Sequence, residues 1–305
     1  MHLTADITNI SRTSLHDGPG VRTVVYFKGC GLRCKWCHNP ETLSAKKEII
    51  FAPVKCICCG RCIEVCPDCH TMVDDKMHFL REKCTVCGRC TEVCPSGALN
   101  AASNDMTVDT LMKQILKDKA FFLQSGGGVT LSGGECLLQP EFCADLLRRC
   151  KDEGIHTMVE TALFVPFENV ERILPFCDAF FADFKIADPE KHRRYTGQGN
   201  ELILENLQKL TELMPGKVTV RIPLIPTVND AEDDVAAFAE KLRPLAEKLA
   251  GIEILRYNSL AKSKYAHCGR EYSDFGEPQT DEFLTDFCSR LETALENTVC
   301  VFTVI

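Results

Sequence analysis

The chain has 305 residues, of which 45% are hydrophobic and 26% are charged, with 19 glycines and 14 prolines. This composition excludes a collagen-like or disordered chain, and the sequence contains no apolar run long enough to span a membrane. The formal net charge of −8 provides no basic field for nucleic acid or for an anionic membrane. The unusual number is that of the cysteines, of which there are 20.

The cysteines are unevenly distributed. Thirteen lie between Cys30 and Cys94, and the other seven are scattered from Cys136 to Cys300. A secreted disulfide scaffold is one interpretation, but that class consists mostly of small domains with little core. The first residues also lack the basic and apolar segments of a signal peptide. We therefore expect a cytoplasmic chain whose closely spaced cysteines bind metal.

Short apolar or β-branched stretches alternate with amphipathic ones outside the cysteine-rich region. The expected strands are 21–27, 129–132, 156–161, 179–186, 218–225 and 252–257. The expected helices are 108–123, 140–153, 202–214 and 231–249. Such alternation predicts an α/β fold of parallel βα units, and six strands favour a partial (β/α)6 TIM-like barrel over a flat doubly wound sheet. In a barrel the active site lies at the C-terminal ends of the strands.

The first expected strand leads into the motif CxxxCxxC, formed by Cys30, Cys34 and Cys37. Three thiolates on a four-iron cluster leave one iron without a protein ligand. An open coordination position allows a substrate or cofactor to bind the metal directly, as in catalytic metal sites. The alternatives are a zinc site and three cysteines that share a turn without function.

Two later segments repeat the pattern CxxCGRCxEVCP, offset by 28 residues. This spacing is typical of bacterial ferredoxins, in which the fourth cysteine of each run binds the other cluster. The predicted ligands are Cys56, Cys59, Cys62 and Cys94 for one [4Fe–4S] cluster, and Cys66, Cys84, Cys87 and Cys90 for the second. Structural zinc is the alternative, although zinc sites usually lack the third cysteine and the proline. We expect residues 48–102 to form a ferredoxin-like insert between two parts of the barrel, residues 1–47 and 103–305.

The CxxxCxxC motif, with Trp36 before its last cysteine, resembles the radical S-adenosylmethionine (SAM) superfamily. The preceding segment SLHDGPGVRT, residues 14–23, is similar to the opening of the activating enzymes of glycyl radical enzymes. The resemblance implies that Cys30, Cys34 and Cys37 hold a [4Fe–4S] cluster whose open iron binds SAM. It further implies that a 5′-deoxyadenosyl radical formed from SAM abstracts hydrogen from a backbone glycine of a partner glycyl radical enzyme.

The duplicated insert makes the chain similar to the longer members of this family, with three [4Fe–4S] clusters in all. The resemblance also implies a flavodoxin or ferredoxin as electron donor. Neither nucleic acid nor a membrane is expected as a partner.

The same resemblance implies which residues contact SAM, because a GGE motif and polar residues follow successive expected strands. The implied SAM-binding residues are Trp36, Cys37, His38, Gly134, Glu135, Asp183, Phe184, Lys185, Arg221 and Asn258. A monovalent cation near the SAM carboxylate would have Glu160, Thr161 and Asp183 as ligands. Several relatives have His where Asn258 stands, and an Asn side chain cannot titrate.

Two other functions are compatible with these motifs. One is a radical SAM enzyme that acts on a small molecule or a peptide, and the other is a ferredoxin-like electron-transfer protein. The segment SLHDGPGVRT favours an activating enzyme, and an electron carrier needs neither an open iron nor a SAM pocket. The single cysteines Cys143, Cys150, Cys177, Cys288 and Cys300 are expected to be small buried hydrophobes.

Overall fold

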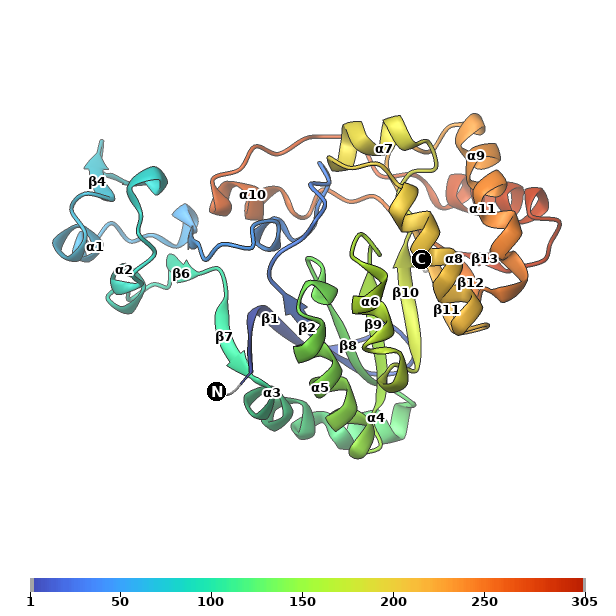
Figure 1. The fold of residues 1–305 in the computed structure, drawn as a ribbon. Coiled ribbons are helices and arrows are strands. Elements are labelled where there is room, and N and C mark those ends of the chain that lie inside the picture. Colours follow the sequence, from blue (N-terminus) through green and yellow to red (C-terminus); the bar gives the residue numbers. More distant parts are fainter. Residues whose placement is uncertain (1–2, 304–305) are drawn as a thin grey trace.

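The computed structural model describes residues 3–303 (Figure 1). Its main element is a nine-stranded sheet of order β13-β12-β11-β10-β9-β8-β2-β1-β7. Six of its strands are mutually parallel neighbours. They are β2 (Arg22–Phe27), β8 (Gly128–Gly133), β9 (His156–Thr161), β10 (Ala179–Asp183), β11 (Val218–Leu224) and β12 (Gly251–Arg256). Each of the six overlaps a strand expected from the sequence, because each is a short, nearly continuous buried run. The strand expected over 179–186 is too long, since β10 ends at Asp183.

Three further strands extend the two edges of the sheet and were not expected. β1 (Thr4–Ser14) pairs antiparallel with β2, β7 (Asn104–Thr107) pairs antiparallel with β1, and β13 (Val301–Phe302) pairs parallel with β12. Within residues 3–303 no pairing joins β13 to β7. The sheet is therefore large, mostly parallel and open.

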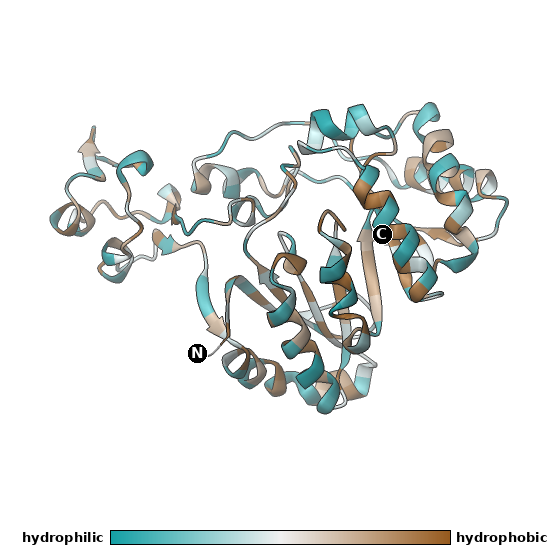
Figure 2. Cartoon of the chain, in the orientation of Figure 1, coloured by the Kyte–Doolittle hydropathy of each residue, from teal (hydrophilic) through white to brown (hydrophobic). Residues whose placement is uncertain are grey.

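Helices cover the outer face of this sheet (Figure 1). Figure 2 shows that they have a hydrophobic and a hydrophilic side, as amphipathic helices over a sheet should. The helices that follow the insert in the chain are α3 (Val108–Ile115), α4 (Lys119–Ser125), α5 (Pro140–Asp152), α6 (Phe167–Glu171), α7 (Pro189–Thr196), α8 (Glu201–Leu213), α9 (Glu232–Leu242), α10 (Lys262–Cys268) and α11 (Asp281–Ala294). Of these, α10 lies away from the sheet and packs against the 3-10 helix Pro40–Thr42 and the strand Ile49–Phe51.

Two of the expected helices are interrupted. The stretch 108–123 contains a 3-10 turn at Leu116–Asp118 between α3 and α4. The stretch 231–249 is α-helical only to Leu242 and continues as the 3-10 helix Arg243–Lys248. Pro244 explains the second change, because proline has no N–H to donate within an α-helix.

Residues 48–102 form a lobe beside the sheet (Figure 1) with a hydrophobic cluster of its own. Its strands are β3 (Ile49–Phe51), β4 (His70–Val73), β5 (Lys76–Phe79) and β6 (Leu99–Ala101), which pair antiparallel as β3 with β6 and β4 with β5. Its helices are α1 (Arg61–Val65) and α2 (Arg89–Glu92).

The sequence repeat of this lobe is also a structural repeat. A 3-10 turn precedes the first cysteine of each run, at Pro53–Lys55 and at Arg81–Lys83. Gly60 and Gly88 then adopt left-handed conformations, with φ of 76° and 83°, immediately before α1 and α2. Glycine suits both positions because it lacks the Cβ that disfavours positive φ.

Four of the five single cysteines named above are buried, as expected: Cys143, Cys150, Cys177 and Cys288. Cys300 is exposed, so the expectation for it was wrong. It directly precedes the two-residue edge strand β13, where little of the chain covers it. No helix among residues 3–303 has both the length and the apolar character needed to cross a membrane.

Candidate active site

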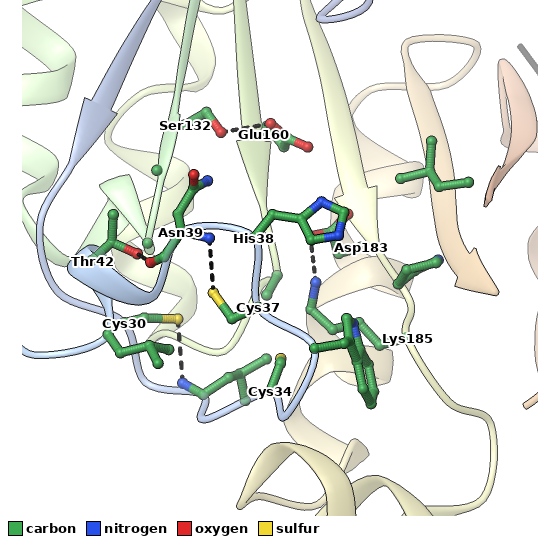
Figure 3. A pocket seen from close by; sticks show the side chains of 18 of the residues that line it. Cys30, Cys34, Cys37, His38, Asn39, Thr42, Ser132, Glu160, Asp183 and Lys185 are labelled. Carbon is green, nitrogen blue, oxygen red and sulfur yellow. Dashed lines mark hydrogen bonds and ion pairs between the residues drawn. The ribbon is translucent and has the colours of Figure 1, made fainter. Parts of the chain in front are cut away.

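A cavity of about 360 Å³ lies at the C-terminal ends of the parallel strands. Strand ends contribute Ser132 from β8, Glu160 from β9, Asp183 from β10 and Leu255 from β12. The Ser132 hydroxyl donates a hydrogen bond to Glu160 at 2.6 Å (Figure 3). The cavity therefore occupies the position at which βα-barrel enzymes place their chemistry.

The loop after β2 brings Cys30, Cys34 and Cys37 to this cavity (Figure 3). The backbone N–H of Leu32 donates to Cys30 Sγ and that of Asn39 donates to Cys37 Sγ, both at 3.4 Å. N–H groups directed at sulfur stabilise the thiolate, which is the form that binds metal.

Burial raises the pKa of these thiols, to about 12 for Cys30 and Cys34 and to about 11 for Cys37. The thiolate form at neutral pH therefore requires positive charge at the sulfurs, which coordinated iron supplies. Within residues 3–303 no three His, Cys, Asp or Glu side chains converge on the position of a single metal ion. Three soft sulfur donors on one loop suit a four-iron cluster, in which each cysteine binds a different iron, better than mononuclear zinc.

The cluster loop, residues 30–37, is fixed from the side of α7. The backbone N–H of Arg33 donates to the carbonyl of Thr196 at 2.6 Å, and that of Lys35 donates to the carbonyl of Tyr195 at 3.0 Å. Trp36 is buried and lines the cavity, and its ring centroid lies 6.4 Å from that of Tyr195. These contacts hold the loop against the end of the sheet.

A lysine from α10 fixes the chain directly after the last cysteine. Lys264 Nζ donates to the carbonyl of His38, to Asn39 Oδ1 and to Glu41 Oε1, each at 3.0 Å. No sequence pattern indicated this contact, because its partners are more than 220 residues apart in the chain.

We expect Lys264→Met to loosen this segment and to speed the loss of iron to a chelator about fivefold. That factor corresponds to about 1 kcal/mol, a modest value because the lysine side chain is partly exposed. Lys262→Met is the matched control, because Lys262 lies on the same helix and, within residues 3–303, no hydrogen bond joins its side chain to residues 38–41. Equal iron-release rates in the two variants would show that the Lys264 contacts do not hold this segment.

Lys185 and Asp183 form an ion pair inside the cavity, with Nζ and Oδ2 2.7 Å apart (Figure 3). Burial lowers the pKa of Lys185, but the Asp183 carboxylate and the nearby sulfurs of Cys34 and Cys30 outweigh burial and raise that pKa overall. Lys185 therefore remains protonated and places a fixed positive charge beside the cysteines.

Arg221 does not line the cavity but contacts Glu160, which does. Its guanidinium donates to Glu160 Oε1 at 3.0 Å, to Glu253 Oε2 at 2.6 Å and to the carbonyl of His16 at 2.6 Å. The guanidinium carbon also lies 3.5 Å from the ring centroid of Phe181. Arg221 thus joins β9, β11 and β12 to the loop between β1 and β2.

Glu135 also binds protein groups instead of lining the cavity. Its carboxyl group accepts hydrogen bonds from the Thr161 hydroxyl at 2.9 Å and from the N–H groups of Leu137 and Ala162 at 3.2 and 3.0 Å. Burial raises the pKa of Glu135 to about 7. Its neighbour Gly134 does line the cavity.

Among the other implied SAM-binding residues, too, some line the cavity and others do not. Phe184 is fully buried and packs edge-on against Phe238 at 5.8 Å between ring centroids. The side chain of Asn258 accepts a hydrogen bond from the N–H of Leu260 at 3.2 Å. Of the ten implied SAM-binding residues, the cavity is lined by Trp36, Cys37, His38, Gly134, Asp183 and Lys185, and not by Glu135, Phe184, Arg221 and Asn258.

The three residues implied as cation ligands all line the cavity. Each already has a protein partner, however: Glu160 binds Arg221, Thr161 binds Glu135 and Asp183 binds Lys185.

Asp17 is a cavity residue that the sequence reasoning did not single out. Burial and the nearby Glu160 carboxylate raise its pKa, and the Ser14 hydroxyl donates to its carboxyl group. The segment SLHDGPGVRT, which contains Asp17, was the signal that could have identified it.

Both predicted ligand sets of the insert are brought together. Cys56, Cys59, Cys62 and Cys94 line a small cavity of about 20 Å³. In the second set, burial and the neighbouring thiols of Cys84, Cys66 and Cys87 raise the pKa of Cys90 to about 11.

Each of the two runs also has a backbone hydrogen bond to the sulfur of its first cysteine. The N–H of Cys58 donates to Cys56 Sγ, and the N–H of Val86 donates to Cys84 Sγ, both at 3.4 Å. The same two-residue spacing occurs at Cys30 and at Cys37.

Comparisons with known proteins agree with this geometry. Residues 24–239 match the Radical SAM superfamily. The chain is 42% identical over 278 residues to the choline trimethylamine-lyase activating enzyme of Oleidesulfovibrio alaskensis, covering 89% of each chain. It is 40% identical over 272 residues to the trans-4-hydroxy-L-proline dehydratase activating enzyme of Clostridioides difficile, covering 87% of this chain and 88% of that one. A radical SAM methyltransferase from Sphaerobacter thermophilus shares the fold, with a TM-score of 0.54 at 12% identity over 98% of this chain and 76% of that one.

The α/β sheet, the cysteine loop at its C-terminal edge and the superfamily match define a radical SAM enzyme. Two relatives at 40% identity or more over most of both chains narrow the class. The chain belongs to the activating enzymes of glycyl radical enzymes. The resemblance based on CxxxCxxC and SLHDGPGVRT is thereby confirmed.

Proposed function

We propose that this cavity activates a partner glycyl radical enzyme through SAM bound at a [4Fe–4S] cluster. The observation that carries this proposal is the meeting of three cysteine sulfurs and the Lys185–Asp183 pair in one cavity. When bound, the cluster and SAM supply one-electron cleavage of SAM and a radical that takes a hydrogen atom from a glycine Cα of the partner.

The chain's own residues bind and orient these groups. Cys30, Cys34 and Cys37 hold the cluster, and the protonated Lys185 provides a charge partner for the SAM carboxylate. Asp183 fixes the position of that ammonium group. Cys34 is buried and the other four groups are partly buried, so the cavity restricts the access of water to the reacting atoms.

The fold type of the open sheet and that of the lobe formed by residues 48–102 can each be assigned more specifically. We infer that the six parallel strands and their helices form a partial (β/α)6 TIM-like barrel, and that residues 48–102 are a ferredoxin-like insert. The pseudo-repeat around Gly60 and Gly88 supports two auxiliary [4Fe–4S] clusters. Their proposed ligands are Cys56, Cys59, Cys62 and Cys94 for one, and Cys66, Cys84, Cys87 and Cys90 for the other.

Anaerobically purified and reconstituted protein should contain about twelve irons, from three four-iron clusters. Iron and acid-labile sulfide analysis measures this directly. Tightly bound zinc without iron would contradict both the SAM cluster and the auxiliary clusters. About four irons would retain the SAM cluster and contradict the assignment of the insert.

The first partners to test are choline trimethylamine-lyase and trans-4-hydroxy-L-proline dehydratase, because the two relatives described above are named for their activation. A reduced flavodoxin or ferredoxin is the proposed electron donor.

A further inference from the structure

A second hollow, of about 540 Å³, also reaches the cluster loop. Cys34 lines both this groove and the cavity in which we propose that SAM binds, here called the SAM cavity. We define the basic groove by the side chains of Arg33, Lys35 and Lys46, which line it beside Cys34. The groove therefore leads from the surface of the protein to a proposed cluster ligand without crossing the SAM cavity.

The basic groove carries positive charge that the protein does not neutralise. All three of its cations are exposed, and within residues 3–303 none of them forms an ion pair with a carboxylate. Arg33 Nη1 donates only to backbone carbonyls, those of Cys30 and Leu32.

The surroundings of the groove add to this charge. Lys35 Nζ lies 5.2 Å from the ring centroid of Tyr195, and the guanidinium of Arg194 lies 5.4 Å from the same centroid. Arg270 in the groove is paired with Glu48 at 2.8 Å, and the carboxylate of Glu271 also faces the groove. Unpaired cations thus outnumber unpaired carboxylates around Cys34.

This local charge is opposite to that of the whole chain, which is −8. An acidic protein is repelled by such a chain on average, so association depends on a local patch of complementary charge. The proposed reaction needs one electron for each SAM cleaved, and the basic groove places a complementary surface next to the metal site that uses it.

We propose that the basic groove is the docking surface of an acidic one-electron donor protein, which reduces the SAM cluster directly and not through the insert. This inference rests on the proposed function. The donor is oxidised by one electron and the cluster held by Cys30, Cys34 and Cys37 is reduced by one. No bond of the protein is formed or broken, and no proton is required.

The competing entry point is the insert, where two other exposed lysines directly precede predicted cluster ligands. Lys55 comes before Cys56, and Lys83 comes before Cys84. This arrangement provides a matched control, because reversing two lysines at either place changes the net charge of the protein equally.

Binding of oxidised flavodoxin, an acidic probe, to the reconstituted enzyme should be measured by calorimetry at low and at physiological ionic strength. We expect the double variant Lys35→Glu/Lys46→Glu to bind at least about tenfold more weakly at low ionic strength. Lys55→Glu/Lys83→Glu should bind within about twofold of the unmodified enzyme. Carbodiimide cross-linking should join flavodoxin carboxylates to Lys35 or Lys46. Loss of binding in the insert variant, with normal binding in the groove variant, would overturn the proposal.

Turnover separates this inference from the function on which it rests. With dithionite as reductant, both double variants should form 5′-deoxyadenosine at the unmodified rate. Neither pair of lysine side chains contacts the SAM cavity, and the contact by which Lys35 holds the cluster loop is donated by its backbone N–H, which the substitution keeps. With reduced flavodoxin, the groove variant alone should be slowed. Failure of the unmodified enzyme to cleave SAM with dithionite would contradict the proposed function. Equal flavodoxin-driven rates in all three proteins would contradict only the docking surface.

Discussion

The Cys34→Ala variant is expected to form no 5′-deoxyadenosine from SAM and dithionite. Cys34 is buried, lies between the other two cysteines of its loop and lines the cavity. Two remaining thiolates cannot hold a four-iron cluster that is meant to keep one iron open. Iron content should fall from about twelve to about eight per chain, because the insert keeps its clusters. Iron analysis and product chromatography measure the two effects.

Cys58→Ala is the matched control for this variant. Cys58 is an exposed cysteine within the first ferredoxin-like run, but it belongs to none of the three proposed ligand sets. Its replacement should leave about twelve irons and normal SAM cleavage. Continued cleavage of SAM by Cys34→Ala would refute the assignment of this loop to the SAM cluster.

The largest effect on stability is expected from Arg221→Met. This change removes the cation between the partly buried carboxylate of Glu160 and the buried carboxylate of Glu253. Breaking a buried ion pair typically costs about 3–5 kcal/mol, because the remaining charge is left without a partner. We expect the thermal unfolding midpoint of the anaerobic holoprotein to fall by roughly 10 °C at pH 7.5. Arg243→Met, which removes an exposed pair with Glu296 at 3.7 Å, should have an effect below about 1 kcal/mol.

The loss of stability caused by Arg221→Met should depend on pH, and the direction of this dependence follows from the pKa of Glu160. In the unmodified protein burial raises the pKa of Glu160, but Arg221 and Ser132 outweigh it and lower that pKa overall. This interaction therefore contributes stability above the unfolded pKa, and the contribution is lost as pH falls through the folded value. Without Arg221, burial raises the pKa of Glu160 relative to its value in the unmodified protein, so this carboxylate takes up a proton more readily as the pH falls. The difference in midpoint between the variant and the unmodified protein should therefore narrow as the pH falls from 7.5 to 5. A constant difference would contradict the role of Arg221 as a charge partner.

The parallel strands were predictable because each is a nearly continuous buried run between turns. β1 was missed because its sequence, TADITNISRTS, is mostly polar and only part of it is buried. The interruption of the helix expected over 231–249 could have been anticipated from Pro244, which cannot donate a backbone hydrogen bond.

Strand geometry also separates successful from unsuccessful site predictions. Asp183 and Lys185 both line the cavity, whereas Phe184 between them is in the core. Side chains alternate between the two faces of an extended segment, so three consecutive residues cannot all face one ligand. Motif resemblance identified the segment, and alternation determines which of its side chains line the cavity.

Contacts between distant parts of the chain could not be predicted. Lys264 donates hydrogen bonds to His38 and Asn39, more than 220 residues away in the chain. Lys46 lines the same groove as Arg33 and Lys35 only because the chain folds back beside the cluster loop. Neither group has a spacing or a composition that indicates proximity. They depend on the docking of α10 and of residues 43–46 against the loop.

The most direct test of the proposed activity is the transfer of hydrogen from the partner. A glycyl radical enzyme labelled with α-deuterated glycine should be incubated anaerobically with this protein, SAM and dithionite. The expected result is deuterium in the 5′-deoxyadenosine, detected by mass spectrometry, together with a glycyl radical signal in the electron paramagnetic resonance spectrum of the partner. Formation of 5′-deoxyadenosine without deuterium, and without a radical on any glycyl radical enzyme from the same genome, would contradict glycine as the substrate.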